Sequence, residues 1–190
     1  MHLILSPSDI FYLTGVRSHD VGEIMILLAA AKPIIFCDMR TSGLFDPEHY
    51  RIIDDRGQWK DELKKYESIE VDPEYLTISL KEKLEQFGPK FTMKASPITK
   101  KRIIKTPEEI QKLRISQQKN KNVYQSLLPS LQVGVTEREV ARKIQIIQLE
   151  QGATGPSFPP IVAFGEHSAI PHHSPTERAL KPGESILLDM

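Results

Sequence analysis

The sequence has little of what marks an exported, membrane-spanning or strongly charged protein. Its 190 residues include a single cysteine, Cys37, so no internal disulfide can form. No run of 18 apolar residues is present, which argues against a transmembrane helix. The opening residues, MHLILSPSD, have no basic segment ahead of the apolar stretch and do not resemble a signal peptide. These absences favour a cytoplasmic protein.

The charges balance, because 25 Lys and Arg residues oppose 25 Asp and Glu residues. A dedicated nucleic-acid-binding protein usually needs a basic face, so we expect no nucleic-acid partner. The basic run at residues 99–105, TKKRIIK, has no aromatic residues among its charges, and we interpret it as a solvated linker. We therefore predict one domain over residues 1–100 and a second over residues 101–190.

In the first domain, expected strands and helices alternate. Two apolar runs within residues 23–38 predict a pair of strands, because Pro33 would interrupt a helix. Residues 59–66 and 76–87 are expected to be helical, and 68–71 to form a strand. This alternation predicts a small α/β domain, in which Cys37 is a buried thiol and not a nucleophile.

The second domain begins with two helices that carry strong start signals. Thr106-Pro107-Glu108-Glu109 and Thr136 followed by Glu139 both have the pattern of a capping box. Strands are expected at residues 161–164 and 185–189. The side chains that we expect to be buried on the two helices are Ile110, Leu113, Val123 and Leu127 on the first, and Val140, Ile144 and Ile147 on the second.

No general catalytic signature such as HExxH, GxSxG, GxGxxG or a Walker loop is present. The candidates that remain are His167, His172, His173 and Asp189. Neighbouring side chains of an extended segment point to opposite faces, so a zinc site built from the three histidines is a poor fit. One histidine could move a proton in a cleft, or all could lie in a surface loop. Asp189 ends an apolar strand, a position typical of both metal ligands and turn residues.

Several segments, taken in order, resemble the Xaa-Pro aminopeptidase and Xaa-Pro dipeptidase (prolidase) family, creatinase-like metallopeptidases with a pita-bread catalytic domain. DIFYLTG at 9–15 is similar to an early family segment that contains YLTG, and CDMR at 37–40 to its DxR strand end. RIIKTPEEIQKLR and GVTEREVA resemble the first two helices of the catalytic domain. The most specific segments are SFPPIVAFGEHSAIPHHSP and LKPGESILLDM, which resemble "FxxIVxxGxNxAxPHxxP" and "LxxGDxxLxDxG".

The resemblance implies an α/β fold class, with a creatinase-like N-terminal α/β domain followed by the first part of a pita-bread α+β catalytic domain. His172 matches the catalytic histidine near the scissile bond, and Asp189 matches the first aspartate of the metal centre. His167 stands where the family often has asparagine. The remaining family ligands lie downstream of Met190, so we expect a truncated catalytic domain that is inactive alone.

The resemblance also implies a hydrolase that cleaves the Xaa-Pro bond with water activated by two divalent ions, Mn, Co or Zn. The expected partners are short proline-containing peptides and a second copy in a homo-oligomer. One carboxylate cannot hold two ions, so we expect none to be stably bound here. The alternative is a non-catalytic peptide-binding or interaction module of pita-bread type.

Overall fold

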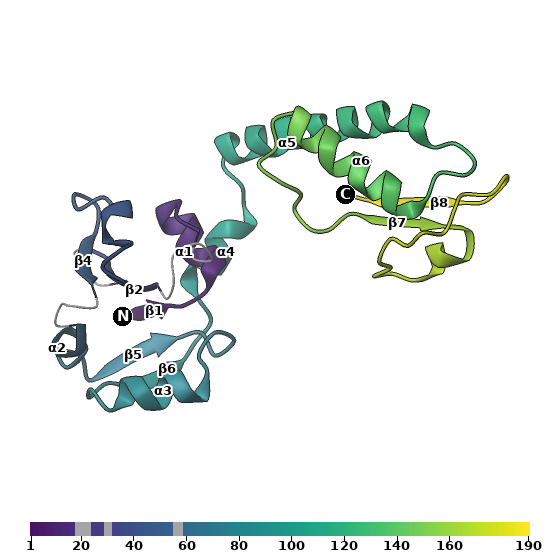
Figure 1. Cartoon of the computed structure of the whole chain (residues 1–190). Coiled ribbons are helices and arrows are strands. Elements are labelled where there is room, and N and C mark those ends of the chain that lie inside the picture. Colours follow the sequence, from purple (N-terminus) through teal and green to yellow (C-terminus); the bar gives the residue numbers. More distant parts are fainter. Residues whose placement is uncertain (18–23, 29–31, 55–58) are drawn as a thin grey trace. The chain divides into compact units, whose positions relative to one another are not determined.

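The computed structural model describes residues 1–17, 24–28, 32–54 and 59–190. The chain divides into two compact units, Met1–Ile104 and Lys105–Met190 (Figure 1). Among the described residues, no helix combines the length and apolar character needed to cross a bilayer. Each unit is built around its own hydrophobic core.

The first unit contains a six-stranded sheet with the order β4-β3-β2-β1-β5-β6. The central strands β1, β2 and β3 pair antiparallel, whereas β4, β5 and β6 join by parallel pairing. The strands predicted on either side of Pro33 are confirmed as β2 and β3, and residues 29–31 between them lie outside the described residues. The strands are β1 (His2–Ile4), β2 (Met25–Leu28), β3 (Ile34–Cys37), β4 (Arg51–Asp54), β5 (Ser68–Val71) and β6 (Lys90–Met93).

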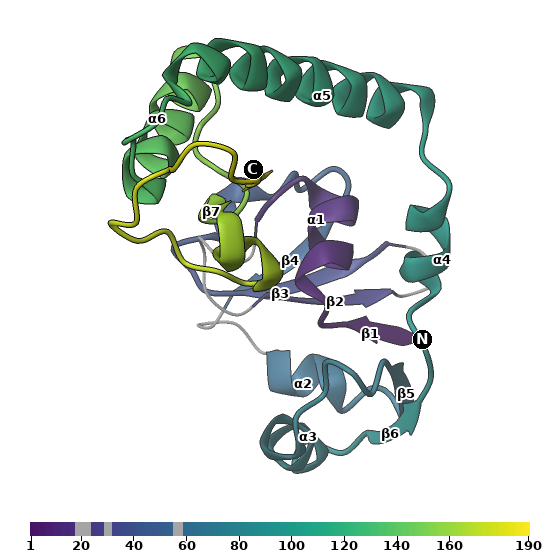
Figure 2. The same ribbon diagram turned by 90° about the vertical axis from the view of Figure 1, so that its right-hand side faces the viewer.

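Helices cover both faces of this sheet, because its central strands are apolar on both sides. Leu27 packs with α2 (Trp59–Leu63) and α3 (Ile78–Glu85) on one face. The neighbouring Ile26 packs with α1 (Pro7–Thr14) and α4 (Pro97–Ile103) on the other. Figures 1 and 2 show these two helix pairs on opposite sides of the sheet. Cys37, the last residue of β3, is buried as predicted. A short helix, η2 (Ser42–Leu44), follows β3.

The interpretation of residues 99–105 as a linker is wrong for residues 99–103, which lie in α4, although all of them except the half-buried Arg102 are solvent-exposed as expected. The start of α4 is stabilised by residues that precede the basic run. Ser96 caps the helix, since its Oγ accepts from the Ile98 amide at 3.2 Å, and Pro97 occupies the first turn. Ile98 is buried against the sheet. The two compact units meet at residues 104 and 105, and the division into domains 1–100 and 101–190 stays a prediction.

A buried carboxylate joins α1 to α4. Asp9 is fully buried in the first turn of α1. One of its oxygens accepts from Ser96 Oγ at 2.6 Å and the other from Arg102 Nη1 at 2.8 Å. Since a buried charge is costly unless it is hydrogen-bonded, this pair of contacts fixes the position of α4 on the sheet.

We expect Asp9→Ala to lower the free energy of unfolding of the first unit by roughly 1–3 kcal/mol, because it leaves the buried Ser96 hydroxyl without its acceptor and removes the partner of the half-exposed Arg102. Urea unfolding of the chain, with hydrogen exchange of the β1 amides as the local probe, measures the change. Asp9→Asn keeps one acceptor and should cost less. Asp61→Ala removes an exposed ion pair to Lys64 and should cost at most about 1 kcal/mol. Equal effects of Asp9→Ala and Asp61→Ala would contradict the assignment.

The second unit places two helices beside a two-stranded antiparallel sheet. Both predicted capping boxes are present, at Thr106–Glu109 and Thr136–Glu139. Strands β7 and β8 pair so that Ile161 lies opposite Asp189. The elements are α5 (Pro107–Leu127), η3 (Leu128–Ser130), α6 (Glu137–Glu150), β7 (Ile161–Phe164), η4 (Gly165–Ala169) and β8 (Ile186–Asp189).

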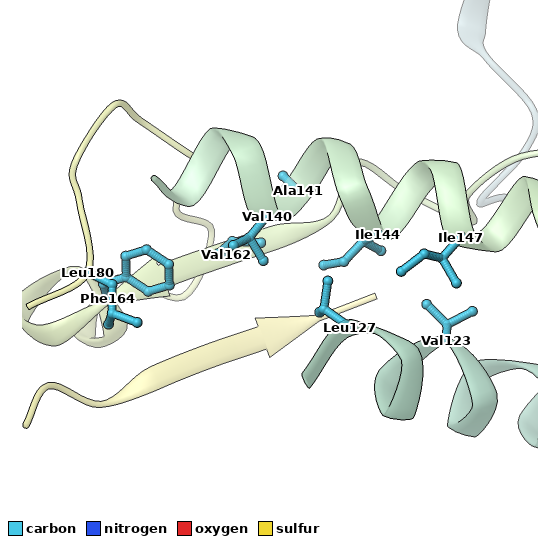
Figure 3. Close-up of a cluster of buried hydrophobic side chains, with 9 residues drawn as sticks. All are labelled: Val123, Leu127, Val140, Ala141, Ile144, Ile147, Val162, Phe164 and Leu180. Carbon is cyan, nitrogen blue, oxygen red and sulfur yellow. The ribbon is translucent and has the colours of Figure 1, made fainter. Parts of the chain in front are cut away.

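The core of this unit lies between α5, α6 and β7 (Figure 3). The predicted buried face of α6 is confirmed, but on α5 only Val123 and Leu127 are buried. Ile110 and Leu113 are 40% and 58% exposed. The core therefore meets only the C-terminal turns of α5. Its members are Val123, Leu127, Val140, Ala141, Ile144, Ile147, Val162, Phe164 and Leu180.

Candidate functional site

The structure brings His172 and Asp189 to the same groove, which has a volume of about 490 Å³. Both side chains are exposed. Asp189 reaches it from the end of β8, opposite Ile161 of β7, and His172 reaches it from the loop after η4. The groove is lined by Phe158, Pro159, Pro160, Ile161, His172, His173, Ser174, Pro175 and Asp189.

The adjacent His173 has different surroundings. Its side chain is buried, and Nε2 lies 2.9 Å from Oε2 of Glu137. The His167 ring approaches the same carboxylate, with Nδ1 2.8 Å from Oε1 of Glu137. Two of the three histidines singled out from the sequence therefore share one carboxylate partner, and His172 is the one left exposed in the groove.

Glu137 is the first residue of α6 and is fully buried. Besides the two imidazoles, its Oε1 accepts from the Phe164 amide at 2.9 Å. Its Oε2 accepts from the amide and the hydroxyl of Thr176, at 3.0 Å and 2.7 Å. Five donors from three segments thus converge on one carboxylate, which satisfies the condition for burying a charge.

These contacts decide the ionisation of Glu137. Burial is the largest single influence and raises its pKa, but hydrogen bonds from the His173 and Thr176 side chains and from the Phe164 and Thr176 amides together outweigh it. The pKa falls from 4.5 to about 2. Glu137 is therefore an anion at neutral pH.

Glu137 is not among the residues predicted from the sequence, although the sequence contains a signal for it. It precedes Val140, Ile144 and Ile147 at spacings of three and four residues, so it lies on the buried face of α6. A charged residue at such a position needs partners from elsewhere in the fold. The sequence shows that partners are required but does not show which residues provide them.

The ligand atoms of Glu137, His167 and His173 lie within 4.8 Å of one another, close enough for a cation. The carboxylate is already satisfied by the five donors, so this cluster is complete without an ion. In the groove, Asp189 is the only carboxylate among the lining residues. A pair of divalent ions requires several shared carboxylates, so the residues described in this chain do not fit a dinuclear centre.

A second ion pair holds the loop between β7 and β8. Both guanidinium nitrogens Nη1 and Nη2 of Arg178 donate to Glu184, at 2.9 Å and 2.5 Å. These bonds, followed by one from the Lys181 amide, lower the pKa of Glu184 to about 2. Gly165 packs against the pair with φ of +51°, and a Cβ there would lie 2.8 Å from Oε1 of Glu184. Only glycine fits this position without displacing the ion pair.

We expect Gly165→Ala to lower the free energy of unfolding by about 1–3 kcal/mol, since it adds backbone strain and a clash with Glu184. Thermal unfolding measures the effect. Gly155→Ala is the matched control, because its φ is not positive and its Cβ would meet no atom within 4 Å. If the two variants have the same melting temperature, Gly165 is not required by the loop.

The low pKa of Glu137 predicts a pH dependence of stability. A carboxylate whose folded pKa lies below its unfolded value stabilises the fold above pH 4.5 and loses that contribution as pH falls from 4.5 towards 2. The loss is on the order of 3 kcal/mol. We expect Glu137→Gln to remove this part of the acid dependence, as measured by melting temperature against pH. An unchanged slope between pH 4.5 and 3 would contradict the prediction.

The chain is similar in sequence to known peptidases. The profile of metallopeptidase family M24 matches residues 111–190. A curated Xaa-Pro dipeptidase from Lactobacillus delbrueckii subsp. lactis is 29% identical over 98% of this chain and 56% of its own length. The chain thus spans about half the length of the curated relatives it matches.

Solved structures share the fold. An Xaa-Pro dipeptidase from Bacillus anthracis superposes with a TM-score of 0.87 at 24% identity, over 98% of this chain and 54% of that one. An X-Pro aminopeptidase from Thermotoga maritima MSB8 gives 0.81 at 22% identity, over 99% and 57%. The resemblance and the fold class inferred from the sequence are confirmed.

Proposed function

From the match of residues 111–190 to metallopeptidase family M24, we propose that this chain carries part of a proline-specific peptidase that hydrolyses the Xaa-Pro bond. The observation that carries the proposal is the shared groove of His172 and Asp189, the two residues that the family resemblance singles out. The proposal covers both dipeptidase and aminopeptidase specificity, since similar structures carry both names.

Each groove residue has a proposed role. His172 donates a hydrogen bond, or passes a proton, to the reacting peptide. Asp189 contributes one carboxylate to a dinuclear centre of Mn, Co or Zn, for which this chain alone does not hold enough ligands. The apolar wall of Phe158, Pro159 and Pro160 offers a surface for the pyrrolidine ring of proline, which general peptidases do not accommodate.

We propose a creatinase-like N-terminal domain over residues 1–100 and the first part of a pita-bread domain over residues 101–190. The two compact units, which meet at residues 104 and 105, support this division. The proposed substrates are short proline-containing peptides, and the proposed compartment is the cytoplasm. The buried and solitary Cys37 agrees with a reducing compartment.

Residues 1–190 with Mn²⁺ or Co²⁺ should not hydrolyse Xaa-Pro dipeptides or Xaa-Pro-Xaa peptides above background, because a single groove carboxylate cannot hold two ions. Product release followed by mass spectrometry tests this expectation. Turnover that is abolished both by a chelator and by Asp189→Ala would show that the chain already holds a working centre.

In a longer protein that contains this chain, we expect His172→Ala to lower kcat by roughly 10²–10⁴-fold. Glu166→Gln is the control, since Glu166 is exposed and does not line the groove. A near-normal rate for His172→Ala would return His172 to an ordinary loop residue. Peptide binding without cleavage by the unmodified protein would support the alternative, a non-catalytic peptide-binding module.

We propose that the protein forms a homo-oligomer through apolar side chains of the second unit. Ile110 and Leu113, three residues apart on one face of α5, are 40% and 58% exposed. Light scattering of residues 1–190 should show association that Ile110→Gln with Leu113→Gln weakens and Lys112→Gln does not. A monomer at all concentrations would contradict this proposal.

A further inference from the structure

We infer that Glu137 is a positioning residue for His172, which it directs into the groove by holding both ends of the turn that carries it. This inference rests on the proposed role of His172. Glu137 does not line the groove, and His172 makes no direct contact with it among the hydrogen bonds of the described residues. The effect passes through the backbone of the loop between η4 and β8.

The turn around His172 is short and closed by its own backbone. The amide of Ile170 donates to the carbonyl of His167 at 3.0 Å, and the amide of His173 donates to the carbonyl of Ile170 at 3.2 Å. The two outer residues, His167 and His173, are those whose rings meet Glu137. Their ring centroids lie only 4.4 Å apart. The carboxylate of Glu137 therefore binds the residues at both ends of the turn, His167 and His173.

The side-chain directions follow from this closure. His173 is turned inward, because its Nε2 pairs with the buried carboxylate. Consecutive side chains of a non-helical segment point in different directions, so holding His173 inward leaves His172 facing outward. The exposed His172 and Asp189 line the same groove, to whose lining the buried His173 also contributes.

The carboxylate is attached to a rigid support. Glu137 begins α6, whose Val140 and Ile144 lie in the core of the unit. The backbone at the start of α6 also holds the far side of the loop, since the amides of Glu137 and Arg138 donate to the carbonyls of Arg178 and Thr176, both at 3.1 Å. These backbone bonds do not depend on the carboxylate. The unit should therefore stay folded when the side chain is changed.

Glu137→Gln is the informative variant. It keeps the size of the side chain but exchanges one acceptor oxygen for an NH₂ group. Each carboxylate oxygen accepts from a backbone amide, that of Phe164 or that of Thr176, so the NH₂ group must set donor against donor at one of the two. We expect the histidine contacts to yield first, because they rely on movable side chains.

NMR of residues 1–190 labelled with ¹⁵N-histidine tests the inference. In the unmodified chain we expect nuclear Overhauser contacts from the His172 ring to groove-lining side chains such as Phe158 and Pro175. Glu137→Gln should abolish or broaden these contacts while the core methyl signals of Val140 and Val162 persist. The matched control is Glu139→Gln, which weakens the capping box of the same helix without touching the turn.

A conservative rescue separates positioning from general stability. His173→Gln keeps a side-chain N–H donor for Glu137 and should preserve the His172 contacts, whereas His173→Ala should lose them. Unchanged His172 contacts in both Glu137→Gln and His173→Ala would overturn the inference. Zn²⁺ at micromolar concentration should leave the His167 and His173 signals unchanged, and their displacement would instead identify the cluster as a metal site.

The longer protein distinguishes this inference from the proposed function. There, Glu137→Gln should lower kcat at least tenfold with little change in KM, because the groove remains and only His172 moves. A normal kcat for His172→Ala would end the proposed role of His172, whatever the NMR result, and the loss of all Xaa-Pro hydrolysis by the unmodified longer protein would end the proposed function. A large loss with His172→Ala but none with Glu137→Gln would end the positioning role alone.

Discussion

The arrangement of η4 and the loop that follows it in the second unit depends on the burial of one negative charge, that of Glu137. Removing a carboxylate from water costs several kcal/mol, and that cost is offset only where enough well-placed donors surround it. Glu137 meets this condition with five donors from β7, η4 and the loop that follows. The loop that carries His172 and His173 contains Pro171 and Pro175 and has no regular secondary structure, and it thereby acquires one defined arrangement. The groove is a consequence of that arrangement.

The first unit uses the same device. Asp9 lies in the first turn of α1 and Glu137 in the first turn of α6, and both are fully buried. The positive end of a helix dipole favours an anion at such a place. Each carboxylate then joins its helix to a segment remote in sequence, α4 in one unit and the His173 loop in the other. In both units, a buried carboxylate at the start of a helix holds a segment that is remote in the sequence against that helix.

What the sequence predicts well is local. The capping boxes at Thr106 and Thr136 and the strands around Pro33 arise from residues within a few positions of one another. The failures have nonlocal causes. The charges of residues 99–103 favour a linker, whereas the contact of Arg102 that holds these residues as a packed helix is with Asp9, far away in the chain. Likewise the burial of Ile110 depends on packing against elements remote in the sequence. Ile110 is not part of the core of its unit and is 40% exposed.

The neighbouring histidines show how far such local reasoning extends towards function. The alternation of side chains indicates that His172 and His173 point in different directions. It does not show which of the two is buried, because that depends on the contact of His173 with Glu137, which is remote in the sequence. A catalytic group must be held to within a fraction of an ångström, and an exposed loop cannot provide this alone. Under the positioning role that we propose for Glu137, the inward His173 supplies this restraint for His172.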